Sequence, residues 1–299
     1  MANLKEIRVR ITSVKSTQQV TSAMKMVSAA KLRKAQDAII QMRPYASELK
    51  KILANVTYNL DSDVDNQYTE HPDVRKILII AIASNRGLCG GFNSNVIKKV
   101  TDQVTNTYAG YYTQGAIDVI AIGKKVSEGL KAKNIRVLKT HHELYDNMNF
   151  KMVSDIAESV MEDYVKGTYD KVEIIYNQFK NAAVQKLEVE QFLPVNITAE
   201  MDQVKDAKGM VIRPFYIFEP SMQEIVGIVI PKSLKIQFFK AMLDSIASEH
   251  GARMTAMHIA TDNASDLLRE LRLNYNKARQ ASITNEILEI VSGANALKS

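Results

Sequence analysis

The residues best suited to support binding or catalysis form a glycine-rich turn, residues 85–91 (NRGLCGG), directly after an apolar run. Such a turn could bind a phosphate through backbone N–H groups. Its spacing matches neither G-x-G-x-x-G nor G-x-x-x-x-G-K-S/T, so it lacks the dinucleotide fingerprint and the lysine and hydroxyl of a P-loop. Anion binding at the start of the following helix remains an alternative to a structural turn whose glycines allow close contact between helix and strand.

A second chemistry would use Cys89, the single cysteine, as a nucleophile with one of the five histidines as base. No local motif ties a histidine to Cys89, and a small core-type cysteine is the favoured interpretation. His141, His142 and Glu143 have the side chains of metal ligands, but adjacent strand residues point to opposite faces and the set lacks ligand spacing. These residues therefore predict no catalytic site, no metal site and no cofactor site.

The elements that would carry any site differ between the ends and the middle of the chain. Ten of the 12 glycines lie between Gly87 and Gly227, and no proline follows Pro231. Residues 3–58 can therefore form one helix, and a second helix of about 60 residues can close the chain after Pro231. At 1.5 Å per residue each is roughly 80–90 Å long, too long for one compact domain.

The apolar spacing of both ends predicts a coiled coil. Steps of three and four residues occur in two stretches of the first helix and again in the last helix. The frame consists of Leu4, Ile7, Ile11, Val14, Leu32, Ala35, Ile39, Met42, Ala46, Leu49, Leu53 and Val56, and of Met257, Ala260, Ala264, Leu267, Leu271 and Ala278. An intramolecular antiparallel pair is the favoured interpretation, and a homodimeric coiled coil is the alternative.

One part of the first helix interrupts this frame. Over this stretch the frame positions are polar, and the apolar residues lie at other positions. The frame positions are Gln18, Thr21, Lys25 and Ser28, and the apolar residues are Val20, Ala23, Met24, Val27 and Ala30. We therefore expect the seam, the line of contact between the two helices, to be broken or rotated here.

The middle of the chain alternates strands with helices. Continuous apolar runs at residues 77–83 and 117–122 are typical of buried parallel strands, with further strands expected at 135–138, 172–176 and 187–193. Helices are expected from about residue 93, at 124–132 and at 153–165, with a polar loop at 197–212 and an edge strand at 213–219. The predicted fold class is α/β: a long antiparallel coiled coil of the terminal helices plus a central Rossmann-like α/β domain with a mostly parallel sheet. The predicted domains are 1–58, 59–220 and 221–299.

The positive charge is concentrated at the start of the chain. Residues 1–58 hold 11 of the 39 basic side chains but only 3 of the 33 acidic ones. A positive electrostatic field confined to one helix implies an acidic partner, and DNA is one candidate. The helix has no aromatic residue before Tyr45 and few side chains suited to base edges, so acidic protein segments explain the charge equally well.

Both ends of the chain carry specific motifs of a known family. Residues 1–43, which include IRVRITSVKSTQQVTSAMKMVSAAKLRKAQ, and residues 274–296, NYNKARQASITNEILEIVSGANA, resemble the two ends of the gamma subunit family of ATP synthases. The turn at 85–91 and ARMTAM at 252–257 also match. The resemblance implies a non-catalytic central rotor shaft that couples proton translocation through the membrane to ATP synthesis in a ring of alpha and beta subunits.

The resemblance also implies partners and contact residues. Arg279, Gln280 and Thr284 match family positions that meet loops of the catalytic ring, and Met24 and Arg253 match positions near that contact. Lys31, Arg33 and Lys34 would face acidic segments of the beta subunits, while Tyr216 and Glu219 would form a foot that reaches the ring of c subunits. An epsilon-type subunit would complete the central stalk, and no nucleic acid is expected.

The location implied is peripheral to a membrane. No run approaches the roughly 20 apolar residues of a membrane span, and the charged N-terminus does not follow the pattern of a secretory signal. We expect association with the membrane only through partners, at the cytoplasmic face of the bacterial inner membrane. The matrix side of the mitochondrial inner membrane is the alternative.

Overall fold

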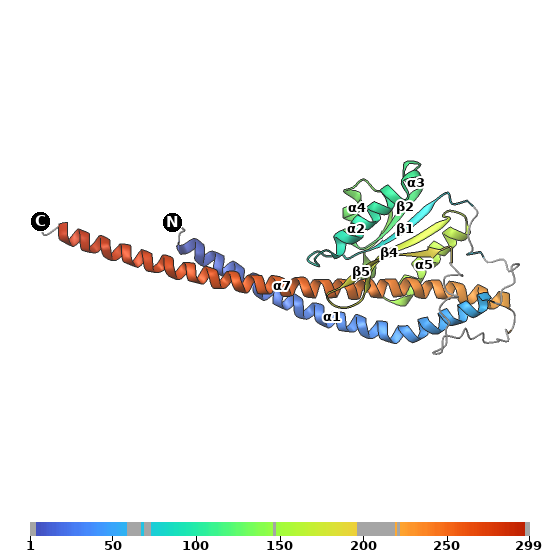
Figure 1. Ribbon diagram of the computed structural model, residues 1–299, viewed down its shortest axis with the longest axis horizontal. Coiled ribbons are helices and arrows are strands. Elements are labelled where there is room, and N and C mark those ends of the chain that lie inside the picture. The colour runs from blue at the N-terminus through green and yellow to red at the C-terminus, as the bar shows by residue number, and fades with distance from the viewer. Residues whose placement is uncertain are drawn as a thin grey trace, which may run out of the picture. The chain divides into compact units, whose positions relative to one another are not determined.

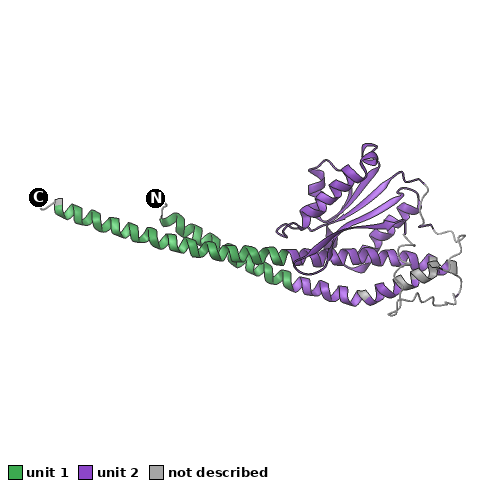
Figure 2. Cartoon of the chain, in the orientation of Figure 1, with its two compact units in different colours: residues 1–29, 253–299 green, residues 30–252 purple. Residues whose placement is uncertain are grey.

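The computed structural model describes residues 4–58, 67–68, 73–145, 148–195, 219 and 222–296. The two longest helices are α1 (Leu4–Tyr58) and α7 (Met222–Ala296), with a sheet and shorter helices between them in the sequence (Figure 1). The chain divides into two compact units, residues 1–29 with 253–299 and residues 30–252 (Figure 2). We call the first the helical-pair unit and the second the sheet unit.

The sheet unit is built on a five-stranded sheet with the order β3-β2-β1-β4-β5. Strands β1 to β4 run parallel to one another, and β5 pairs antiparallel with β4. The prediction of a mostly parallel sheet is confirmed. The strands are β1 (Ile77–Ile82), β2 (Ile117–Ile122), β3 (Val137–His141), β4 (Lys171–Phe179) and β5 (Gln185–Leu193).

Different helices cover the two faces of this sheet. The even-numbered residues of β1 pack with α5 (Phe150–Val165) and with residues 230–242 of α7. The odd-numbered residues pack with α2 (Phe92–Asp102) and α4 (Lys124–Lys131). Every residue of β1 is therefore buried, which explains the continuous apolar run in its sequence. The remaining short helices are η1 (Gln103–Thr107), α3 (Ala109–Thr113) and η2 (Glu143–Tyr145).

The glycine-rich turn after β1 is fixed by its own polar side chains. The backbone N–H and the hydroxyl of Ser84 both donate to Asn93 Oδ1, at 3.0 and 2.9 Å, and Asn93 Nδ2 donates to Cys89 Sγ at 3.2 Å. Asn85 Oδ1 accepts from the backbone N–H of Lys124 at 3.0 Å, at the start of α4. These contacts join β1, α2 and α4, and Cys89 is buried among them. They support the interpretation of the motif as a structural turn.

Gly123 directly follows β2 and lies against the backbone of Ala83, which directly follows β1. Its φ is +101°, and its N–H donates to the carbonyl of His141 at 3.1 Å. A Cβ at this position would lie 1.9 Å from the carbonyl oxygen of Ala83. Both the backbone conformation and the available space therefore require glycine.

Helix α7 begins earlier than the sequence predicted. It starts at Met222 and passes through Pro231, which was expected to precede it. Proline lacks the N–H that would bond to the carbonyl of Gly227, four residues earlier. Because Gly227 is exposed, water can satisfy that carbonyl. Helix α1 continues through Pro44 in the same way.

Within the sheet unit, α7 is a core helix. Phe238 is fully buried, and its ring centroid lies 5.8 Å from that of Phe192 on β5. Ser248 Oγ donates to the backbone carbonyl of Asn177 on β4 at 2.9 Å. At Gly251 a Cβ would lie 3.1 Å from the carbonyl oxygen of Ala182, so helix and loop are in close contact.

Two predicted segments, the loop at 197–212 and the edge strand at 213–219, lie outside the described residues except for Glu219. No helix in the described ranges combines the length and the apolar character that crossing a membrane requires.

Candidate partner interface on the helical pair

The helical-pair unit consists of residues 4–29 of α1 packed against α7 from Arg253 onward. Hydrogen-bonded partners run in opposite directions along the two helices, so the pair is antiparallel, as predicted (Figure 2). The bonds join Arg8 to Tyr275 at 2.8 Å, Gln18 to Ser265 at 2.7 Å and Thr21 to Thr261 at 2.8 Å.

The α7 side of this seam follows the predicted apolar frame. Met257, Ala264 and Leu271 are buried, as their spacing indicated. Leu268 is buried too, whereas the predicted Leu267 is only half-buried. The sequence places the two leucines side by side, and spacing alone did not identify which one faces α1.

The α1 side corrects the expectation of a broken or rotated seam. The frame continues through the polar stretch: Thr21 and Ser28 are buried, and Gln18 is half-buried. Ser28 satisfies its hydroxyl by donating to the backbone carbonyl of Met24 at 2.8 Å. Polar residues can occupy the seam because each finds a partner on α7 or within its own helix, and a satisfied polar group costs little when buried.

A charged layer extends these polar contacts. Lys25 Nζ lies 3.2 Å from Nδ1 of His258, and Asp262 Oδ2 lies 3.4 Å from the same nitrogen. His258 and Asp262 are more than half exposed. A solvated cluster of this kind contributes little to stability but helps to fix the register of the two helices.

Of the apolar residues displaced from the frame, Val20 and Val27 are more than half exposed, whereas Met24 is half-buried. Met26, next to Val27 on α1, is also more than half exposed. Ile259 and Leu273 are equally exposed on α7. These side chains are available for contact with a partner.

The antiparallel register predicts a specific cross-link. The hydroxyl oxygens of Thr21 and Thr261 are 2.8 Å apart, so sulfurs in their place would lie within bonding reach after a small adjustment. We expect the double variant Thr21→Cys, Thr261→Cys to form a disulfide within one chain in nearly all molecules under mild oxidation. Mass spectrometry of the alkylated protein measures this yield.

The control is Val20→Cys combined with Thr261→Cys, because Val20 points away from the seam. This pair should remain reduced. Buried Cys89 is common to both variants. Disulfide-linked dimers of the Thr21 and Thr261 variant would instead support the homodimeric coiled coil.

Beyond Arg279, α7 continues without a helix beside it in the described part of α1 (Figure 2). Residues 279–295 are all exposed. Their exposed apolar side chains are those of Ile283, Ile287, Leu288, Ile290 and Val291. A single helix with this surface is a second candidate for contact with a partner.

The three predicted ring contacts lie on this segment. Arg279, Gln280 and Thr284 span about 7.5 Å along the helix axis. Thr284 Oγ1 donates to the backbone carbonyl of Gln280 at 2.9 Å, so its hydroxyl is oriented. Among the described residues, no ion pair or hydrogen bond holds the guanidinium of Arg279, which leaves its donors available for a partner.

The other predicted contacts lie elsewhere. Met24 is half-buried, and Arg253 is buried on α7. Lys31, Arg33 and Lys34 are exposed on the part of α1 that belongs to the sheet unit. Glu219 is exposed, and Tyr216 lies outside the described residues.

The side chains considered for metal binding do not converge. Within the described ranges, no group of three or more histidine, cysteine or acidic side chains could hold a metal ion. His141 ends β3, where burial, and to a lesser degree Lys139, lower its pKa.

Comparison with known proteins decides the family. The family model described as ATP synthase matches residues 3–297. The ATP synthase gamma chain of Flavobacterium johnsoniae is 56% identical over 297 residues, 99% of either chain. The chain belongs to the ATP synthase gamma chain family. Subunits of this family are non-catalytic parts of the ATP synthase stalk, and the catalytic sites lie on other subunits.

A more distant relative covers the chain equally well. The gamma chain of Cytophaga hutchinsonii is 48% identical over 299 residues, with full coverage of both chains. The resemblance at the two ends and the central turn therefore extends over the intervening residues.

Solved structures share the fold of this gamma chain family member. A chain of the Euglena gracilis mitochondrial ATP synthase, in an assembly of OSCP, F1 and c-ring, gives a TM-score of 0.67 at 21% identity, with 98% of this chain and 94% of that chain covered. A chain of the Tetrahymena thermophila central stalk and c-ring gives 0.57 at 24% identity, with 81% and 99% covered.

Proposed function

We propose that this chain is the rotating shaft of an F-type ATP synthase and couples proton translocation through the membrane sector to ATP synthesis. Its partners are the alpha and beta subunits of the catalytic ring, an epsilon-type subunit and the ring of c subunits. The observation that carries the proposal is an antiparallel helical pair that ends in a single exposed helix, in a chain of the gamma family.

Each of the three predicted domains has its own role in the rotating complex. Residues 1–58 and 221–299 act as the shaft, and residues 59–220 form the central α/β domain. Tyr216 and Glu219 meet the c subunits. The complex lies at the cytoplasmic face of a bacterial membrane, which agrees with bacterial relatives of nearly equal length.

Charge supports the placement of the beta subunits. Lys31, Arg33 and Lys34 are exposed within a strongly basic helix, and they face acidic segments of those subunits. Long-range attraction of this kind favours alignment without fixing one orientation. A shaft that turns needs contacts that form and break, so exposed charges suit it better than buried ion pairs.

Arg279 and Gln280 form transient hydrogen bonds with the ring, and their removal tests the proposal. We expect the double variant Arg279→Ala, Gln280→Ala to fold but to lower ATP synthesis about tenfold. One charge-assisted hydrogen bond of roughly 1.5 kcal/mol, lost at the limiting step of rotation, gives this factor. The measurement is ATP synthesis driven by a proton gradient in inverted membrane vesicles.

The matched control is Asn276→Ala with Lys277→Ala, an adjacent cation and amide one turn earlier on the same exposed helix. This variant should retain nearly the wild-type rate. Unaltered synthesis in the Arg279 and Gln280 variant, with normal assembly, would refute their role in coupling.

A further inference from the structure

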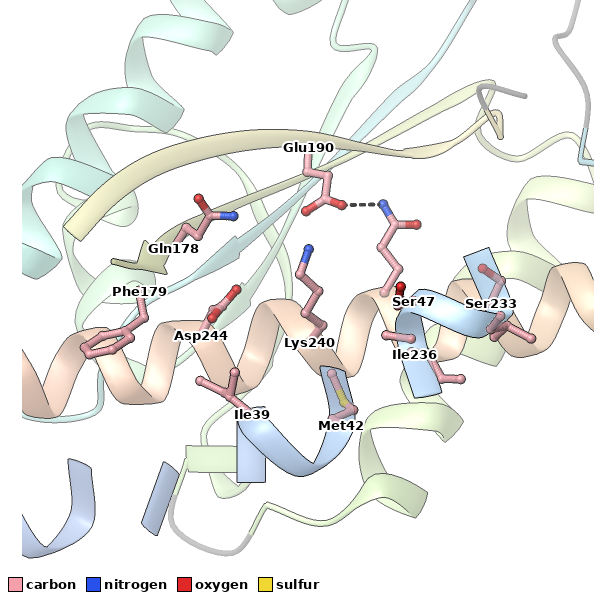
Figure 3. Close-up of a pocket in the computed structure, with 13 residues that line it drawn as sticks. Ile39, Met42, Ser47, Gln178, Phe179, Glu190, Ser233, Ile236, Lys240 and Asp244 are labelled. Carbon is pink, nitrogen blue, oxygen red and sulfur yellow. Dashed lines mark hydrogen bonds between the residues drawn. The ribbon is translucent and has the colours of Figure 1, made fainter. Parts of the chain in front are cut away.

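The sheet unit contains a cavity of about 520 Å³ between α1, the β4–β5 hairpin and α7 (Figure 3). Its size is within the range of small-molecule sites. We call it the hairpin cavity. Because all its lining residues belong to the sheet unit, the cavity is a feature of that unit alone.

One wall of the hairpin cavity is apolar. Ile39 and Met42 come from α1 and Ile236 from α7. Phe179, the last residue of β4, also lines the cavity (Figure 3). Ile39 and Ile236 are almost fully buried. A hydrocarbon group placed against this wall would gain roughly 25 cal/mol for each Å² of apolar surface removed from water.

The opposite wall presents a carboxylate in a fixed position. Glu190 Oε2 accepts from the hydroxyl of Tyr176 at 2.7 Å, and Oε1 accepts from Gln237 Nε2 at 2.9 Å. Gln237 Nε2 also donates to the backbone carbonyl of Gln191 at 3.2 Å, which holds the amide in place. A carboxylate has about four lone-pair sites, so both oxygens can still accept from a ligand.

Tyr176 keeps the carboxylate of Glu190 oriented across the physiological pH range. The residue is 1% exposed, and burial, followed by the negative charge of Glu190, raises its pKa. The phenol therefore stays protonated and continues to donate throughout the physiological range. Glu190 is thus oriented before any ligand arrives, which reduces the entropic cost of binding.

The charges around Glu190 favour a cationic head group. Glu190 supplies the carboxylate that faces the cavity with fixed hydrogen bonds, and Lys240 adds one ammonium to the lining. Figure 3 shows Glu190 extending from β5 and Lys240 from α7 toward the same space. In the described part of the chain, no carboxylate lies within ion-pair distance of Lys240, so Glu190 is not already neutralised by it. An anionic head group placed against Glu190 would be repelled by its carboxylate.

We propose that the hairpin cavity binds a small amphiphilic organic ammonium ion, with its N–H groups donating to Glu190 and its hydrocarbon part against Ile39, Met42 and Ile236. The inference goes beyond the function of the chain as a shaft and does not depend on it. A bound amine would connect α1, β5 and α7 within the sheet unit.

Three ligands with the same eight-carbon chain test the head group. Octylammonium, octanol and octanoate are titrated separately into the full-length chain by isothermal titration calorimetry. We expect octylammonium to bind at least tenfold more tightly than octanol, and octanoate to bind more weakly than octanol. Equal affinity for octanol and octylammonium, or preference for octanoate, would overturn the proposal.

Variants of the lining test the site. Glu190→Gln keeps an acceptor for Tyr176 but removes the charge, so it should weaken octylammonium binding about tenfold and leave octanol unchanged. Lys240→Met should strengthen octylammonium binding about threefold by removing a like charge. Glu128→Gln, which removes the same charge from an exposed position on α4, is the matched control and should have no effect.

A cavity-filling change separates loss of the site from loss of the fold. Ala46→Phe, on α1, adds volume to the hairpin cavity without altering its charge and should abolish binding of all three ligands. Circular dichroism must show a folded chain for each variant that is compared. Octylammonium binding that survives in folded Ala46→Phe, or in Glu190→Gln at the wild-type affinity, would place the ligand elsewhere and refute the assignment.

Discussion

Replacing Gly123 with alanine should destabilise the sheet unit by about 4 kcal/mol or more, a change large enough to prevent its stable folding. Two causes act together. The φ of +101° is unfavourable for any residue with a Cβ, and that atom would lie 1.9 Å from the carbonyl oxygen of Ala83. The carbonyl cannot move away without disturbing the end of β1. Urea unfolding followed by near-UV circular dichroism of the buried tyrosines measures the loss.

Gly87→Ala is the matched control in the same unit. Gly87 has no atom within 4 Å of an added Cβ and no positive φ, so we expect a change within about 0.5 kcal/mol. A Gly123→Ala protein as stable as the Gly87→Ala protein would contradict the close approach of Gly123 to the carbonyl of Ala83.

Phe238→Ala should lower the free energy of unfolding by about 3–5 kcal/mol. The ring is fully buried between α7 and the sheet, and its contact with Phe192 would be replaced by a void. The same unfolding experiment measures the effect. Because α7 is one continuous helix, this substitution also tests whether the last helix depends on the sheet for its stability.

Ile228→Ala is the control on the same helix. Ile228 is 68% exposed, and its truncation should change stability by no more than about 0.5 kcal/mol. Comparable effects of the two substitutions would contradict the burial of this face of α7 against the sheet.

The fold was largely predictable because its two parts have opposite sequence patterns. Apolar runs such as that of β2, at residues 117–122, indicated strands covered on both faces, and the structure contains that strand with the same bounds. The absence of glycine before Gly87 indicated the long first helix. The start of the last helix was not predictable, because Pro231 usually marks a helix boundary and here lies inside one.

The polar seam was missed for a physical reason. Periodicity methods assume that buried positions are apolar, whereas Thr21 and Ser28 are buried with their hydroxyl groups hydrogen-bonded. The pairing of Thr21 with Thr261 depends on the register of helices more than 200 residues apart in the sequence. Aligning the two helices in antiparallel order, polar residue against polar residue, could have found this signal.

The candidate interface was predictable only through resemblance. Nothing in the spacing of Arg279 and Gln280 distinguishes them from other exposed pairs on a helix, such as Asn276 and Lys277. The structure adds that residues 279–295 are exposed without a neighbouring helix in the described part of α1.

The outward position of Val20, Met26 and Val27 has a consequence for biogenesis. Where no partner subunit covers these apolar side chains, they remain in water, and free copies of the chain would tend to aggregate. Cells should therefore match its production to that of the subunits that surround it, or rely on chaperones to shield it in the interval.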